Sequence, residues 1–124
     1  KERFSLTGAN IALGMRRLVI KALGADVWRD KPNILIIAPG PILKECENSP
    51  VGSNMGKCSD KSYKLSMEYK FVADELKVGF FDAAPYVVMN DIDFMHLTAD
   101  SHIALAKKVS EIIKETLENK EVKI

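Results

Sequence analysis

Apolar side chains recur at helical spacing in the first two-thirds of the chain. One such stretch runs from Thr7 to about Leu23 and another from about Ser62 to Leu76, with apolar positions three and four residues apart. Gly24, directly after the first stretch, is a residue that commonly ends a helix. The apolar positions are Ile11, Met15, Leu18, Val19 and Ala22 in the first stretch, and Leu65, Tyr69, Val72 and Leu76 in the second.

A third helical pattern begins at Thr98 and continues to about Glu118. Thr98 suits the N-cap because its hydroxyl can accept a hydrogen bond from a backbone N–H of the first turn. Asp100 in that turn complements the positive end of the helix dipole. The face that we expect to be buried carries Leu105, Ala106, Val109, Ile112, Ile113 and Leu117.

Two short, continuous apolar runs predict β-strands at 33–38 and 78–82. Runs of this kind are typical of strands that are buried on both faces of a parallel sheet. The first run ends at Pro39-Gly40-Pro41, which forms a rigid strand exit. Because helices and strands alternate along the chain, the pattern predicts an α/β fold with a parallel sheet covered on both faces.

Two strands are too few for the three helices that this pattern predicts. A two-stranded parallel sheet cannot bury the apolar faces of helices on both of its sides, so we expect further strands from outside this segment. The chain begins at Lys1 without an initiator methionine, and its last helix already closes the C-terminal end. We therefore expect the missing strands to precede Lys1, and residues 1–124 to form the C-terminal part of one larger domain.

A long polar segment, from about Leu43 to Lys61, contains both cysteines, Cys46 and Cys58. Loops of this length inside a domain are usually functional, so we expect a lid or a subunit contact here. Two cysteines make a weak disulfide framework, and free thiols are favoured over a pair.

The composition is that of an ordinary globular protein. Of the 124 residues, 47% are hydrophobic and 28% are charged, and the net charge is +1. This charge gives no reason to expect nucleic acid or acidic membranes as partners. No apolar run approaches the roughly 18 residues that a membrane span needs. There is no signal-peptide pattern. The location is unknown from the sequence, with the cytoplasm slightly favoured.

The segment before the last helix contains the candidate chemistry, because Asp93 lies three residues ahead of His96. A catalytic histidine needs a carboxylate on one ring nitrogen, which selects the tautomer and stabilises the imidazolium formed during the reaction. In open parallel sheets, sites form beyond the carboxyl ends of the strands, and this segment follows such an end. An Asp-x-x-His pair alone is a weak signal, since capping and surface histidines are more common.

The residues from Asp93 to Thr98 (Asp-Phe-Met-His-Leu-Thr), with His102 and Leu105-Ala106 after them, resemble the last conserved block of SGNH (GDSL-type) hydrolases. The strand and turn at 34–42 is similar to the strand ending in Ala-Pro-Pro-Pro-Ile of the family's arylesterase-like and acetylesterase-like members. The first helix resembles the one that follows the family's Gly-x-Asn-Asp block, which would end just upstream of Lys1. The resemblance covers nearly the whole chain, in order.

This resemblance implies the C-terminal half of a flavodoxin-like three-layer α/β/α sandwich that hydrolyses carboxylic esters with a Ser-His-Asp triad. His96 would be the general base and Asp93 would orient it. The nucleophilic serine and the oxyanion donors belong to family blocks that this sequence does not contain, so the segment alone is expected to be inactive. Pro39, Gly40 and Pro41 would form a wall of the substrate pocket, looser than in the family because Gly40 replaces a proline.

The implied partner is a small ester substrate, with no metal and no organic cofactor. Since similar families often assemble, we also consider a homo-oligomer. The competing hypothesis is a non-catalytic flavodoxin-like fragment or interaction module, which the absent nucleophile and the exposed sheet edge favour.

Several residues have simpler interpretations that compete with a catalytic one. Asp91 is the nearest rival to Asp93, and we interpret it as a solvated carboxylate. His102 is expected to pack or to form a hydrogen bond, and Trp28 to lie in a core or an interface. No serine of the polar segment lies in a Gly-x-Ser-x-Gly or Gly-Asp-Ser turn; these serines are Ser49, Ser53, Ser59 and Ser62.

Two other roles for the cysteines are weaker still. Cys46 or Cys58 could act as a thiol nucleophile for His96, but neither has an activating context. A metal site from the two cysteines with His96 and His102 would have spacings that match no familiar zinc pattern.

Overall fold

A computed structural model describes residues 5–55 and 57–121, and for Cys58, Lys120 and Glu121 it describes the backbone alone. The elements follow one another as helix, strand, helix, strand and helix, with short helical turns between them. Their bounds are α1 Gly8–Leu23, β1 Leu35–Ala38, η2 Lys44–Asn48, α2 Gly52–Met55, α3 Cys58–Leu76, β2 Gly79–Asp82, η3 Ala84–Tyr86 and α4 Ala99–Glu121. The order of elements predicted from the hydrophobic pattern is confirmed.

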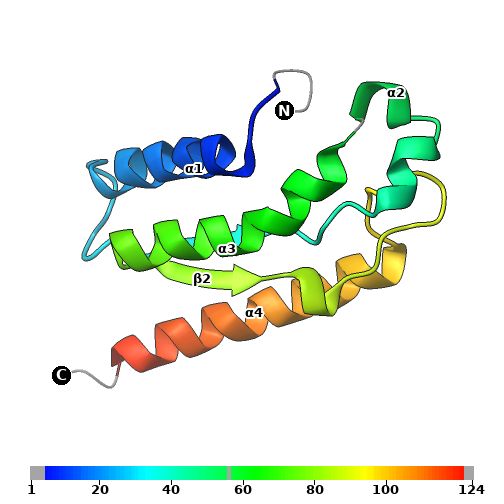
Figure 1. Cartoon of the computed structure of the whole chain (residues 1–124). Coiled ribbons are helices and arrows are strands. Elements are labelled where there is room, and N and C mark those ends of the chain that lie inside the picture. Colours follow the sequence, from blue (N-terminus) through cyan, green and yellow to red (C-terminus); the bar gives the residue numbers. More distant parts are fainter. Residues whose placement is uncertain (1–4, 56, 122–124) are drawn as a thin grey trace.

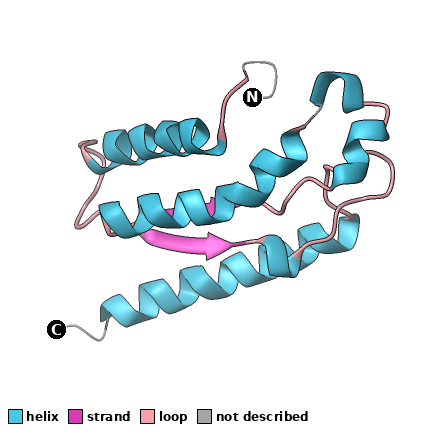
Figure 2. Ribbon diagram, in the orientation of Figure 1, coloured by secondary structure: helices cyan, strands magenta, loops and turns pink. Residues whose placement is uncertain are grey.

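The two strands form a parallel pair, as predicted (Figures 1 and 2). Leu35 pairs with Gly79 and Ala38 pairs with Asp82, so the carboxyl ends of both strands meet at one edge. Helices α1 and α3 lie on one side of this pair and α4 on the other (Figure 1). The chain thus has the three layers of an α/β/α sandwich around two strands.

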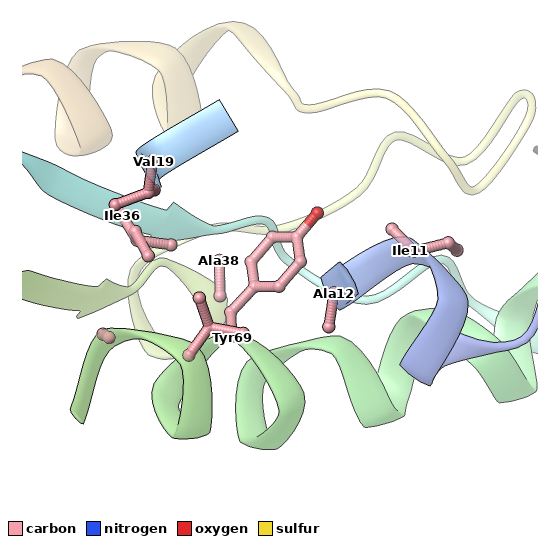
Figure 3. Packing of buried hydrophobic residues seen from close by; sticks show 8 residues of the cluster. Ile11, Ala12, Val19, Ile36, Ala38 and Tyr69 are labelled. Atoms are coloured by element: carbon pink, nitrogen blue, oxygen red, sulfur yellow. The ribbon is translucent and has the colours of Figure 1, made fainter. Parts of the chain in front are cut away.

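The core lies between the strands and the α1/α3 layer. Alternate side chains of a strand point to opposite faces, and Ile36 and Ala38 of β1 are accordingly buried against this layer. Figure 3 shows them meeting α1 side chains around the ring of Tyr69 from α3. The buried residues of this cluster are Ile11, Ala12, Val19, Ile36, Ala38, Tyr69, Val72 and Ala73.

Helix α1 begins as the local sequence dictates. Thr7 accepts a hydrogen bond from the backbone N–H of Asn10 at 3.1 Å, and the Asn10 side chain accepts one from the backbone N–H of Thr7 at 3.2 Å. This reciprocal capping satisfies donors that the first turn would otherwise leave unpaired. The predicted end is also confirmed, because the N–H of Gly24 donates to the carbonyl of Ile20.

Two predicted apolar faces are wrong in part. Leu18 of α1 is 65% exposed, although its spacing placed it with the buried residues. On α4, Ile113 and Leu117 are 49% and 54% exposed, and Ala106 is exposed as well. The physical reason is that two strands present too little surface to cover these helices. Among the described residues, no helix is both long and apolar enough to cross a bilayer.

The segment predicted as one long loop has structure of its own. It contains η2 and α2, and α3 begins at Cys58, four residues before the predicted start. Ser62, buried in the first turns of α3, accepts a hydrogen bond from the backbone N–H of Ile42 at 2.8 Å. This bond joins the exit of β1 to α3, so the two ends of the segment are held together.

Candidate active site

The Asp93/His96 pair lies on a loop between β2 and α4 whose two ends are joined. Met89 and Leu97 form an isolated antiparallel bridge, and the N–H of Thr98 donates to the carbonyl of Val88 at 3.0 Å. The loop therefore leaves the sheet and returns beside its own start before α4 begins. The candidate site therefore lies on a compact loop whose two ends are hydrogen-bonded to each other.

The start of α4 anchors this loop. Ser101 is buried, and its hydroxyl accepts a hydrogen bond from the N–H of Val88 at 2.7 Å. The Thr98 side chain accepts one from the N–H of Ser101 at 3.2 Å, which confirms Thr98 as the N-cap. The first turn of the helix thus holds the backbone at Val88, where the loop begins.

Within the loop, the imidazole of His96 meets the carboxylate of Asp93. His96 Nδ1 lies 2.7 Å from Asp93 Oδ2. The other oxygen, Asp93 Oδ1, accepts hydrogen bonds from the backbone N–H groups of Met95 and His96 and from the Asn90 side-chain amide, each at 3.0 Å. The carboxylate is 17% exposed, whereas the histidine side chain is 70% exposed.

These donors favour the ionised carboxylate. The pKa of Asp93 is held well below its usual range, first by the backbone N–H of His96, then by its imidazole and by the backbone N–H of Met95. An ionised carboxylate can only accept hydrogen bonds, so the proton in the contact with His96 belongs to Nδ1. In the neutral imidazole this leaves the lone pair on Nε2, to which no described residue is hydrogen-bonded. The geometry suits a general base that faces outward.

Two contributors to this geometry are not singled out by the sequence motif. Asn90 Oδ1 accepts hydrogen bonds from the backbone N–H groups of Ile92 and Asp93, which closes a tight turn. Phe94 has a φ of 58°, in the left-handed region. An Asn that begins a polar turn is a recognisable signal, but nothing in the sequence marks Phe94 for this conformation.

The exit of β1 lies beside the loop, since the N–H of Leu43 donates to the carbonyl of Phe94 at 3.0 Å. Pro39 and Gly40, but not Pro41, line a mainly apolar cavity of about 250 Å³. The cavity is also lined by the two neighbours of His96 in sequence; its remaining lining residues are Ile37, Ala83, Val87, Met89 and Leu105. Two of the three predicted pocket residues are therefore next to the histidine loop.

Whether Gly40 makes this wall looser than a proline would stays a prediction, but the structure shows what fills the space beside it. Gly40 is buried, and a Cβ placed on it would lie 2.5 Å from Val87 Cγ2 and 2.7 Å from Met89 Cε. The side chains of the loop occupy the space that a larger residue would need. The glycine thus brings the loop closer to the strand exit.

The rival residues do not join the pair. Asp91 is exposed, as expected for a solvated carboxylate. His102 is exposed too, so the expectation that it packs is wrong. The hydroxyls of Ser49 and Ser62 donate to the carbonyls of Cys46 and Ser59, and no hydroxyl of the described residues is hydrogen-bonded to His96.

Trp28 is half-buried after α1, where its indole N–H donates to the carbonyl of Ala22 at 2.8 Å. This contact shows it as part of the fold's packing.

The structure tests only part of the cysteine hypotheses, because it describes the side chain of Cys46 and not that of Cys58. Cys46 is a buried free thiol in η2. The side chain of Cys58 lies outside the described part of the chain, and so does its pairing. Among the described residues, no three His, Cys, Asp or Glu side chains gather as a metal site would require.

Comparison with known proteins gives a result only at the level of structure. No family model matches the sequence. No curated protein matches it either.

Solved structures match over most of the chain. Est24, a carbohydrate acetylesterase from Sinorhizobium meliloti, is 31% identical, with a TM-score of 0.78 over 92% of this chain and 54% of its own. The native aryl esterase of M. smegmatis is 26% identical, with a TM-score of 0.79 over 93% of this chain and 55% of its own.

A carbohydrate acetylesterase family member from S. meliloti is 25% identical, with a TM-score of 0.78 over 90% and 54% of the two chains. This chain therefore spans about half the length of the esterases that it matches.

Proposed function

Since the chain belongs with the esterases of the SGNH hydrolase type and has the fold of their C-terminal portion, we propose that it supplies the acid–base half of a serine esterase. In this proposal His96 is the general base and Asp93 is its orienting carboxylate. The observation that carries the proposal is the 2.7 Å contact between His96 Nδ1 and Asp93 Oδ2, with Nε2 directed away from that contact.

The proposed reaction proceeds through an acyl-enzyme. His96 Nε2 takes the proton of a serine hydroxyl as the serine oxygen attacks the ester carbonyl, and then donates that proton to the departing alkoxide. Water then attacks the acyl carbonyl while it gives a proton to the same nitrogen. His96 returns this proton to the serine oxygen as the bond between that oxygen and the acyl carbon breaks, which releases the acid and restores the serine. Asp93 remains ionised throughout and stabilises the imidazolium.

The serine and the oxyanion donors come, in this proposal, from a segment outside these 124 residues that completes the same domain. Two observations support this. No hydroxyl of the described residues is hydrogen-bonded to His96, and the chain spans about half of its structural relatives. On its own, the segment is expected not to hydrolyse esters.

We place the substrate among carboxylic esters with a small acyl group. Two of the similar structures are a carbohydrate acetylesterase and an aryl esterase, which supports an ester bond and, for the first, an acetyl group. In this proposal Pro39 and Gly40 shape the acyl side of the pocket, with Pro41 beyond them at the strand exit. The cavity lined by Pro39 and Gly40 is mainly apolar, which suits an acyl chain better than a charged group.

The test is ester hydrolysis by the full-length protein that contains this segment, with p-nitrophenyl acetate as substrate. His96→Ala is expected to lower kcat by roughly 10³-fold or more, and Asp93→Asn by a comparable order, because both remove the general base or its correct tautomer. Asp91→Asn, a change in an exposed carboxylate two residues away, is the matched control and should behave as wild type. Ordinary activity in His96→Ala would show that the proposal is wrong.

A non-catalytic module remains the second candidate, and one observation favours it. Large apolar side chains are exposed on both helical layers, among them Phe71 on α3 at 71% and Ile103 on α4 at 69%. Such surfaces also suit contact with a partner. A full-length protein with a correct fold but no reactive serine would favour this candidate.

A further inference from the structure

We propose that Asn90 is the positioning residue of the Asp93/His96 pair, an inference that rests on the catalytic role proposed above. It would act through the geometry of the pair without touching the substrate. The argument follows from what the two ends of its side-chain amide do.

The oxygen end of Asn90 shapes the backbone. Asn90 Oδ1 accepts hydrogen bonds from the N–H of Ile92 at 2.8 Å and from the N–H of Asp93 at 3.0 Å. A side-chain carbonyl that accepts from the residues two and three positions later forms the kind of turn for which Asn and Asp are preferred. This turn fixes the backbone between Asn90 and Asp93.

The nitrogen end contacts both members of the pair. Asn90 Nδ2 donates to Asp93 Oδ1 and to the carbonyl of His96, each at 3.0 Å. The backbone N–H of Asn90 donates to the same His96 carbonyl at 2.7 Å. Asn90 therefore binds both members of the pair, Asp93 at the side-chain carboxylate and His96 at the backbone carbonyl.

The hydrogen bonds to one oxygen of Asp93 determine which of its oxygens is left for the imidazole. Asp93 Oδ1 already accepts three hydrogen bonds, from Met95, His96 and Asn90, so Oδ2 is the one that meets His96 Nδ1. The His96 side chain is 70% exposed and has little packing to orient it. The orientation of the imidazole therefore depends on its hydrogen bond to Asp93, and Asn90 in turn holds the carboxylate of Asp93.

No other residue type supplies the same set. Alanine would remove both ends of the amide. Aspartate would keep the turn-forming oxygen but would place a second carboxylate about 3 Å from Asp93, where two negative charges repel. Comparing the two variants therefore separates the effect of losing the turn from the effect of losing the Nδ2 donor.

The experiment measures kcat and KM for p-nitrophenyl acetate in the full-length protein for Asn90→Ala and Asn90→Asp. We expect kcat to fall roughly ten- to hundred-fold in both, with KM changed much less, because a small misplacement of the base affects the transition state and not binding. Asp91→Ala, an exposed neighbour, is the matched control and should keep the wild-type kcat.

A double variant separates positioning from a general structural effect. If Asn90 acts through His96, adding Asn90→Ala to His96→Ala should lower the residual activity by no more than about two-fold, since the residue that it positions is gone. An equal further loss in that background would overturn the proposal, and so would a wild-type kcat in both Asn90 variants. Asn90→Asp keeps the test usable if Asn90→Ala does not fold, because it retains the turn.

The two proposals fail in different ways. Full activity in His96→Ala would overturn the proposed function and this inference with it. Loss of activity in His96→Ala together with normal kcat in the Asn90 variants would overturn only the role of Asn90.

Discussion

At the residue scale, the candidate site depends on short polar side chains that hydrogen-bond to nearby backbone. Asn90 and Asp93 together accept or donate most of the hydrogen bonds within the loop, and every partner lies within six residues. Such local bonds hold a loop in one conformation without a core beneath it. This explains how a histidine that is 70% exposed still has a defined partner.

The low pKa of Asp93 makes the stability of this loop depend on pH. A carboxyl whose pKa is lower in the folded than in the unfolded protein stabilises the fold above its ordinary range, near pH 4. That contribution is lost progressively as the pH falls below this range toward the folded pKa. We therefore expect the difference in Tm between wild type and Asp93→Asn to be greatest at neutral pH and to shrink on acidification. Thermal unfolding followed by circular dichroism between pH 7 and pH 3 checks this, and a difference independent of pH would contradict it.

At the scale of elements, helix ends are as informative as helix faces. α3 ends with the N–H of Val78 bonded to the carbonyl of Ala73 and the N–H of Lys77 bonded to that of Asp74. This pair of bonds normally has glycine at the left-handed position. Here Lys77 occupies it, with a φ of 54°.

Replacing Lys77 with glycine should stabilise the protein. The left-handed conformation costs a residue with a Cβ roughly 1–2 kcal/mol, and glycine avoids this cost but loses part of the gain to its greater freedom when unfolded. We expect Lys77→Gly to raise the free energy of unfolding by roughly 0.5–1 kcal/mol. Lys77→Ala keeps the Cβ and serves as the control. Denaturant unfolding of both variants in the full-length protein decides the matter, and equal stability of the two would show that the backbone strain is not relieved.

At the scale of the whole molecule, the arrangement is three layers around only two strands. One layer, α1 with α3, forms a well-buried core with β1, while α4 on the opposite face keeps large apolar side chains half-exposed or exposed. The Arg16–Glu75 ion pair joins α1 to α3 with three hydrogen bonds from the guanidinium Nε and Nη2, but it is on the surface, where such pairs contribute little. This chain matches only about half the length of the similar esterases.

Active-site labelling tests that arrangement. A fluorophosphonate probe should label one serine in the full-length protein, outside these 124 residues, and should not label the isolated segment. The physical reason is that the probe reacts with a serine only when a base and oxyanion donors activate it. Intact mass spectrometry with peptide mapping locates the label. A labelled serine within this segment would contradict the proposed division of the triad.

Much of the fold could be predicted from the sequence because the signals are local. Helical spacing, the Thr98 cap and the apolar strand runs depend on residues close together in the chain, and the observed elements agree with them. The starts of elements were displaced by up to four residues, as for α3. Leu18 and the exposed part of α4 could not be predicted, since burial depends on what lies opposite.

For the site, the sequence by itself determined that a carboxylate precedes a histidine by three residues at the carboxyl end of a buried strand, because that spacing and that strand are local properties. Only the tertiary structure decided which oxygen of Asp93 meets His96, that Asn90 holds both, and that Gly40 lets Val87 and Met89 approach the strand exit. The contact at Gly40 joins segments that are far apart in the sequence. The contacts among Asn90, Asp93 and His96 are local in sequence, but their atoms meet only in the folded backbone of the loop, with Phe94 in the left-handed region. Distances across such contacts follow from the packing of the elements and have no counterpart in the order of residues along the chain.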